Sequence, residues 1–236
     1  PYTTLFRSIG SAELKTGFKA IVAQSLGVAE DALLAGDLIL YPRERGCVWG
    51  AENEFVSSAR LDDLQCVYGC LRGLLDAADG ESAAVLSVFD NEEVGSGTKQ
   101  GADSSFLEDV LCRVSAALGR SDVQYRALLT NSFMVSADNA HAVHPNHPEY
   151  ADRNDRPEMN KGIVIKHNAN QRYTTDAVSA AAFEAVCRRA EVPVQSFTNR
   201  ADIAGGSTLG HISAAHVSIN TVDIGLAQLA MHSAYE

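Results

Sequence analysis

Apolar side chains recur every three or four residues in several stretches of the chain, the spacing of an amphipathic helix. One stretch runs from Ala12 to about Leu26, and a short helix at Ala29–Ala35 can follow it. The predicted buried faces of three later helices are Leu61, Leu64, Tyr68, Leu71 and Leu75; Phe106, Val110, Leu111, Val114 and Leu118; and Val178, Ala182, Ala185 and Val186. We expect each of these faces to pack against a core.

Short apolar runs between the helices predict strands. They are Asp37–Tyr41, Ala83–Phe89, Ser132–Ala137, Ile163–Lys166, Val192–Thr198 and Val217–Ile224. Because strands alternate with helices, the pattern predicts a doubly wound α/β domain with its site at the strand ends. The charged, glycine-containing segment 42–50 indicates a connection, and we place a domain boundary near it.

The strand predicted at Ala83–Phe89 runs into an acidic turn that contains Glu92 and Glu93. Ligands bind at this end of the strands in open α/β sheets. Adjacent residues at a strand end point in opposite directions, so one glutamate can hold a metal while the other faces a substrate or a water. The alternative is a solvated loop, which is the commoner explanation for an isolated pair of glutamates.

A second predicted strand ends in Asp138 and is followed by His141, His144 and His147. Closely spaced histidines suit zinc, but the prolines at 145 and 148 make helical geometry unlikely to persist there. His141 and His144 therefore remain either site-lining or structural, and His147 is expected to be exposed.

Composition limits the classes of function. A chain of 236 residues, 46% hydrophobic and 21% charged, is typical of a globular protein with a sizeable core. No apolar run approaches the roughly 18 residues of a membrane span, and no signal peptide is visible. The formal charge of −11 argues against a nucleic-acid partner. Five cysteines without zinc-finger spacing favour a reducing cytoplasm, where we interpret them as small core residues.

Sequence motifs narrow the choice further. Neither GxGxxG nor GxxxxGK[ST] occurs, which disfavours a nucleotide-dependent enzyme. The GSG at Gly95–Gly97 lacks the GxSxG pattern, so a serine hydrolase is a poor fit.

Six segments resemble, in order, the signature segments of the aspartyl aminopeptidase family of di-zinc exopeptidases. They are AENEFVSSARLDDL, VFDNEEVGSGTKQGADS, SADNAHAVHPN, NKGIVIKHNANQRYTTDAVS, GGSTLG and QLAMHS. The similarity spans roughly Ser11 to Glu236, and SADNAHAVHPN is highly specific. It implies a zinc-exopeptidase-like α/β fold, with a mixed sheet flanked by helices.

The resemblance also implies a division of the chain. Residues 47–236 would be the C-terminal part of a metallopeptidase domain, and residues 9–46 the tail of a β-rich inserted assembly domain. Residues 1–8, PYTTLFRS, have no helical or strand period, and we interpret them as a non-native artefact.

The resemblance assigns roles to individual side chains. Glu92 would be the general base, and His141 and Lys166 match substrate-contacting positions. Asp62, in RLDD where the family usually has RLDN, would bridge both zinc ions, while we interpret Asp63 as a helix-start residue. The implied metal ligands are Asp62, Glu93, Asp138 and His232.

A member of this family would be a cytoplasmic homo-oligomer that releases an N-terminal residue, Asp or Glu, through a water activated by two zinc ions. The carboxylate-rich set could also take manganese or cobalt. The family's remaining zinc-binding histidine belongs to a segment upstream of Asp62, where this chain has no histidine, so we expect the chain by itself to be inactive. The alternatives are a related di-metal amidohydrolase or deacylase, and a non-enzymatic interaction protein.

Overall fold

The computed structural model describes residues 17–78 and 80–236. It divides into two compact units, with the boundary between Tyr41 and Pro42. In the first unit, helix α2 (Phe18–Leu26) begins after Gly17 and is followed by the 3-10 turn η1 (Glu30–Ala32). The helix predicted at 12–26 is thus confirmed from Phe18 onwards. Residues 12–16, and the segment 1–8 interpreted as an artefact, lie outside the described residues.

The strand predicted at 37–41 is wrong. The described residues contain no strand there, and the side chain of Ile39 is 77% exposed. A strand requires a neighbour that completes its hydrogen-bond ladder, which an apolar run cannot supply by itself. The assignment of this unit to an inserted assembly domain stays a prediction.

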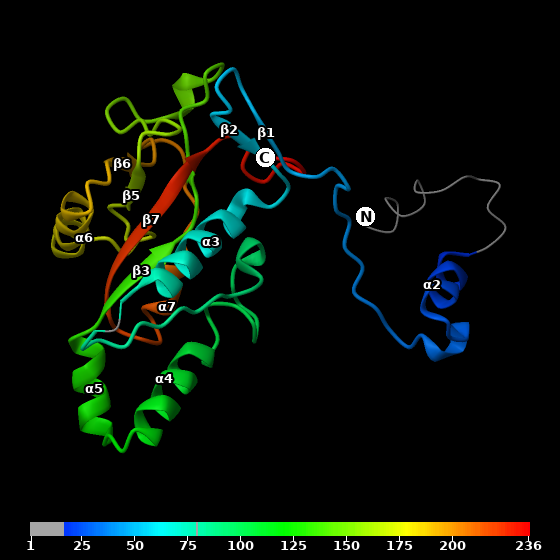
Figure 1. The fold of residues 1–236 in the computed structure, drawn as a ribbon, viewed down its shortest axis with the longest axis horizontal. Helices are drawn as coiled ribbons and strands as arrows, with labels where there is room; N and C mark the ends of the chain where they lie inside the picture. Colours follow the sequence, from blue (N-terminus) through cyan, green and yellow to red (C-terminus); the bar gives the residue numbers. More distant parts are fainter. Residues whose placement is uncertain (1–16, 79) are drawn as a thin grey trace. The chain divides into compact units, whose positions relative to one another are not determined.

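The second unit is built on a mixed sheet in the order β3–β7–β5–β6 (Figure 1). Strand β7 is parallel to β3 and antiparallel to β5, which is parallel to β6. A short strand, β4, continues along β7 beyond β3 in the same register. The mixed sheet expected from the resemblance is therefore confirmed. The strands are β3 (Phe133–Ala137), β4 (Ala140–His141), β5 (Ile163–His167), β6 (Val194–Thr198) and β7 (Asn220–Gln228).

Three predicted strands, at 132–137, 163–166 and 192–198, are confirmed within a residue or two. The strand predicted at 217–224 is also present, but it begins at Asn220. Val217 lies before it and is fully buried, in a core cluster with Tyr125 and Leu129 of α5.

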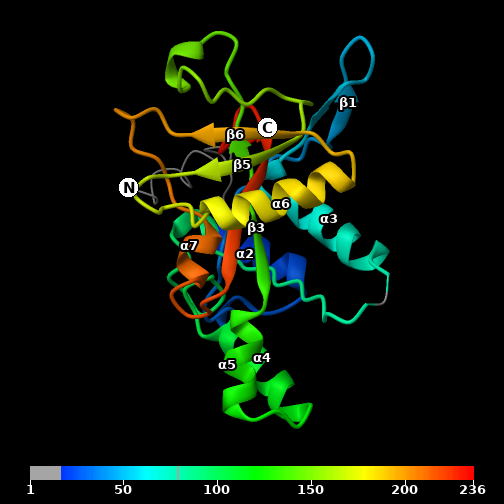
Figure 2. The same ribbon diagram turned by 90° about the vertical axis from the view of Figure 1, so that its left-hand side faces the viewer.

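Helices cover both faces of the sheet (Figures 1 and 2). Val222 of β7 packs against Ala180 of α6, whereas the next residue, Asp223, faces Gly210 of α7. This alternation is that of a strand buried on both sides. The helices of the second unit are α3 (Leu61–Asp76), α4 (Phe106–Ala117), α5 (Asp122–Thr130), α6 (Ala177–Arg189) and α7 (Leu209–Ser213).

Helices α3, α4 and α6 lie where the periodicity predicts them, whereas α5 was not predicted, and several predicted faces are wrong. On α6 the predicted residues are exposed, and Ser179, Ala180, Phe183 and Cys187 face inward instead. Phe183 packs against the core cluster of Ile165, Ala180 and Val222, which turns this face of the helix toward the sheet. On α3 only Cys66 is buried, and on α4 only Leu111 of the predicted face packs against a core cluster. Leu64 and Val114, for example, are more than half exposed.

The segment 83–89 is extended but forms no strand, because it pairs with no other strand in the described part of the chain. Conversely, segment 42–50 is more than a connection: it contains β1 (Cys47–Trp49), which pairs antiparallel with β2 (Phe55–Ser57). The cysteines are core residues only at Cys66 and Cys187. Among the described residues, no helix has the length and apolar character of a membrane span.

Candidate metal centre

The break between β3 and β4 places Asp138 at the edge of the sheet. Its backbone N–H donates to the carbonyl of Ile224 at 3.0 Å. A side chain at Gly225 would place its Cβ 2.1 Å from the carbonyl oxygen of Asp138, so only glycine permits this approach. The position of Asp138 is therefore fixed by β7.

Asn139 fastens the start of α3 to the same edge. This buried side chain donates to the carbonyl of Leu61 at 2.9 Å and accepts from the Cys66 thiol at 3.1 Å. The first turn of α3 departs from helical geometry at Asp62 and Asp63, and both carboxylates lie close to Asp138.

The acidic turn is a short 3-10 helix, η2 (Glu92–Val94), between left-handed residues Asn91 and Gly95. The Asn91 side chain donates to Thr98 Oγ1 at 3.0 Å and closes the loop. A Cβ at Gly101 would lie 2.0 Å from the carbonyl oxygen of Ser96, so the loop needs glycine there as well. These contacts hold Glu92 and Glu93 in place.

His232 meets two of these carboxylates. Its Nε2 atom lies 3.1 Å from Glu93 Oε2 and 3.4 Å from Asp62 Oδ2. The side chain of Asp62 is only 6% exposed, whereas those of Glu93 and His232 are 54% and 62% exposed. Three segments distant in sequence thus form a donor set that is closed on one side and open to solvent on the other.

A second donor set shares Asp62 and adds Asp63 and Asp138. In each set the candidate ligand atoms lie within 4.8 Å of one another. Burial, reinforced by the charges of Asp138 and Glu93, raises the pKa of Asp62 to about 8. Burial also raises the pKa of Asp63 to about 7. Among residues 17–78 and 80–236, no hydrogen-bond partner reaches the buried Oδ1 atom of either aspartate.

The donor chemistry fits a divalent cation. Buried carboxylates that repel one another are stabilised by a positive charge, and the two orphaned Oδ1 atoms need a partner. The set containing His232 offers nitrogen and oxygen, which zinc accepts, while the second set offers only carboxylate oxygen. The residues present therefore fit the metal that the sequence predicts.

Glu92 lies beside these sets and belongs to neither. Burial, with the charges of Asp138 and Glu93, raises its pKa to about 7, although Lys166 and His232 act in the opposite direction. A carboxyl group with a pKa near neutrality can both accept and donate a proton.

The two residues predicted to contact substrate lie near Asp138. Lys166 is almost fully buried, with its Nζ atom 3.2 Å from Asp138 Oδ2 and 5.5 Å from the centre of the Tyr173 ring. His141 follows on β4, and its pKa is lowered by burial and by electrostatic interaction with His232 and Lys166.

The other two histidines of the loop lie apart from both donor sets. The rings of His144 and His147 lie 5.5 Å apart, and His147 Nδ1 is 3.0 Å from Glu149 Oε1. His147 is exposed, as predicted. The three histidines do not converge on one ion.

Sequence reasoning did not assign Asp63 to a donor set. Asp63 lies in the first turn of α3, as the interpretation as a helix-start residue expects, and its carboxylate also belongs to the second donor set. The signal was the second acid of RLDD, where the family usually has asparagine.

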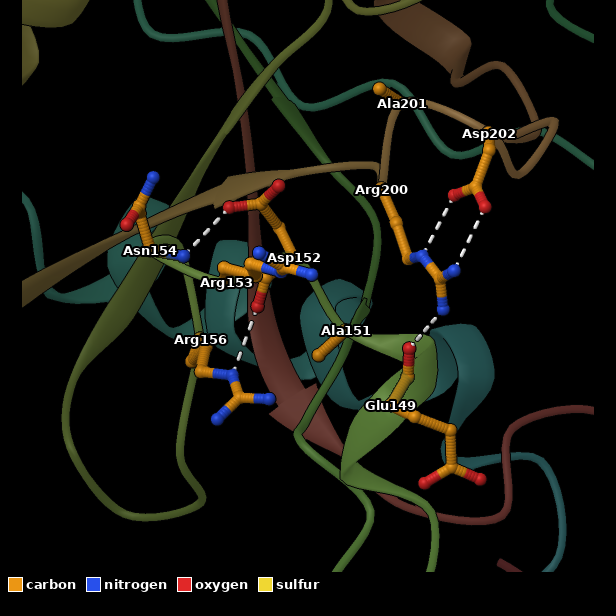
Figure 3. Close-up of a pocket in the computed structure, with 9 residues that line it drawn as sticks. All are labelled: Glu149, Ala151, Asp152, Arg153, Asn154, Arg156, Arg200, Ala201 and Asp202. Carbon is orange, nitrogen blue, oxygen red and sulfur yellow. Dashed lines mark hydrogen bonds and ion pairs between the residues drawn. The ribbon is translucent and has the colours of Figure 1, made fainter.

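A separate pocket of about 540 Å³ lies between the loops that follow β4 and β6 (Figure 3). Its lining residues include Arg156 and Arg200 but none of the donor sets. Arg200 Nε lies 2.7 Å from Asp202 Oδ1, and Arg156 Nε donates to the Asp152 carbonyl at 2.9 Å. Arg200 also donates to the carbonyl of Glu149, which links the two loops, and the pocket takes no part in the metal centre.

Comparisons with known proteins place this geometry in context. A family model described as aminopeptidase I zinc metalloprotease (M18) matches residues 8–236. A probable M18 family aminopeptidase 2 of Clostridium acetobutylicum is 50% identical over 216 residues, which make up 92% of this chain and 50% of that protein. The chain spans about half the length of the curated relatives it matches.

Solved structures give the same picture. The S. cerevisiae mApe1 dodecamer is similar with a TM-score of 0.79 and 33% identity, covering 92% of this chain and 49% of that one. An M18 aminopeptidase from Thermotoga maritima has a TM-score of 0.84 at 25% identity, over 96% and 53% of the two chains.

Proposed function

The chain belongs to the aminopeptidase I zinc metalloprotease (M18) family, and from this premise we propose that the whole protein is a zinc-dependent aminopeptidase. The observation that carries the proposal is the meeting of Asp62, Glu93 and His232 from three separate segments. Asp62 belongs to both donor sets, so its two oxygens are the group that can bridge two ions. We propose one ion at Glu93 and His232 and a second at Asp138, with Asp63 as an additional oxygen donor.

Zinc held there would lower the pKa of a water molecule and polarise the carbonyl of the first peptide bond. Glu92 is the proposed general base, because its pKa of about 7 lets it take the proton of the attacking water and return it to the leaving amine. Its place beside the donor sets, outside both of them, leaves its carboxylate free for this proton transfer.

We propose that the substrate is a peptide with an N-terminal Asp or Glu. Lys166 is the cation nearest to Asp138, and with His141 it forms the side of the centre at which an acidic side chain would be recognised. The alternative is that Lys166 only orients the Asp138 carboxylate, which its 3.2 Å contact supports equally well.

The test is metal content together with turnover of aspartyl- and leucyl-anilide, on the full-length protein and on the 236-residue chain. We expect the full-length protein to bind about two zinc ions and to cleave the aspartyl substrate, and the 236-residue chain to be inactive. Metal binding without cleavage of either anilide would favour a related amidohydrolase or deacylase. A panel of acyl-amino acids then distinguishes the two.

The relatives suggest further properties of the whole protein. Because the S. cerevisiae relative forms a dodecamer, we propose a homo-oligomer, which the mass in solution of the full-length protein would test. The unpaired cysteines support a cytoplasmic location as part of the same proposal.

A further inference from the structure

One carboxylate holds the backbone of two proposed ligands at once. Glu236 Oε2 accepts the backbone N–H of Asp62 at 2.8 Å, and Glu236 Oε1 accepts the backbone N–H of His232 at 3.0 Å. The two amides belong to segments far apart in sequence. The carboxylate therefore ties the first turn of α3 to the turn that carries the histidine.

Both amides lie where regular structure offers them no partner. Asp62 has φ −84° and ψ 112°, outside the helical region, although it stands in the first turn of α3. His232 has φ 67°, a left-handed conformation that is strained for a residue with a Cβ. A side-chain acceptor is what keeps such a backbone in one conformation.

The backbone of Glu236 is itself fixed. Its N–H donates to the carbonyl of Ser58 at 2.9 Å, and its carbonyl accepts the N–H of Ser58 at 3.0 Å. The neighbouring hydroxyl of Tyr235 donates to the carbonyl of Arg45 at 2.9 Å. The two backbone bonds with Ser58 fix Glu236 beside β2 and so hold its carboxylate in place, and the Tyr235 bond is a separate contact of the same segment.

We propose that Glu236 is a positioning residue that sets the separation of Asp62 and His232. The inference rests on the proposed function, because it takes these two residues as metal ligands. The two N–H groups are accepted by two different oxygens of Glu236, so glutamine, with one oxygen and one NH₂ group, would turn a donor toward one of them. Residues that orient metal ligands from outside the coordination sphere are worth about 10–100-fold in metal affinity.

The experiment compares the 236-residue chain with its Glu236→Gln variant by cobalt titration, with the visible spectrum of the bound cobalt as the report of ligand geometry. We expect Glu236→Gln to lower cobalt affinity about tenfold and to change the spectrum. In the metal-free variant, hydrogen exchange at the amides of Asp62 and His232 should become roughly tenfold faster.

The matched control is Tyr235→Phe, which removes the neighbouring hydroxyl bond to Arg45 but leaves the Glu236 carboxylate and its backbone bonds with Ser58. This variant should keep the parental cobalt affinity and cobalt spectrum, whereas a general structural role of the segment would lower the cobalt affinity of both variants. Parental affinity and exchange in Glu236→Gln would overturn the inference and leave the proposed function intact. If the parental chain takes up no cobalt, or if His232→Ala takes it up as tightly as the parental chain, the metal centre itself fails for this chain.

Discussion

Lowering the pH from 8 to 6 should weaken zinc binding steeply. In the metal-free protein the pKa of Asp62 is raised to about 8 and that of Asp63 to about 7, in both cases mainly by burial. Carboxylates coordinate metals in their ionised form. Zinc must therefore displace protons from these groups whenever the pH lies below their pKa values.

The size of the effect follows from the ionised fractions. At pH 6 about 1% of Asp62 and about 10% of Asp63 are ionised, compared with about 50% and about 90% at pH 8. The apparent association constant should fall about 50-fold if only Asp62 binds the metal, and about 500-fold if both do. The second figure corresponds to nearly three powers of ten, well above the error of a competition titration.

The assay is competition with a chromophoric chelator at pH 6, 7 and 8, with protons released measured by calorimetry in two buffers. Asp63→Asn is the control, because it removes one titrating carboxylate and leaves His232 and Asp62 in place. Its affinity should fall less between pH 8 and pH 6 than that of the parental chain. An affinity that is the same at pH 6 and pH 8, with no protons released, would refute the carboxylate ligand sets.

The remaining predictions concern stability and turnover. With the metal removed by a chelator, the chain should become less stable as the pH rises from about 4 to 8. The pKa values of Asp62, Asp63 and Glu92 are raised in the folded state, so the stability that these groups contribute is lost as they ionise. Urea denaturation at pH 5 and pH 8 tests the sign of this change. The Glu92→Gln variant of the full-length protein should still bind zinc, but its kcat should fall by about 10²–10⁴-fold. Turnover near the parental value would refute the assignment of Glu92 as the general base. Lys166→Met should reduce cleavage of aspartyl-anilide more than that of alanyl-anilide. An equal loss of activity on both substrates would exclude a role in selectivity and would favour the alternative that Lys166 only orients Asp138. Ser121→Ala removes the capping box at the start of α5 and should lower the free energy of unfolding by about 1 kcal/mol, measured by chemical denaturation against a surface substitution on the same helix.

Local pattern determined much of this protein. Periodicity located helices α2, α3, α4 and α6 and most of the sheet, because one turn of helix or one pleat of strand repeats within a few residues. Motif resemblance pointed to Asp62, Glu93, Asp138 and His232, and the structure brings three of them together and places Asp138 in the set that shares Asp62. Their roles as ligands stay predictions.

The tertiary structure decided the features that depend on contacts between segments distant in sequence, namely strand pairing, the buried faces of helices and the donor sets. Residues 83–89 are apolar but form no strand, since a ladder needs a second strand. Helix α6 turns Ala180 and Phe183 to the sheet, where they pack with Ile165 and Val222. Asp63 joins the donor set only because the first turn of α3 departs from helical geometry. Glu236 reaches two amides far away in sequence, and no periodicity along the chain encodes such a contact. The sequence by itself thus identified which candidate ligand side chains the protein has, while the tertiary structure brought those side chains together from distant segments.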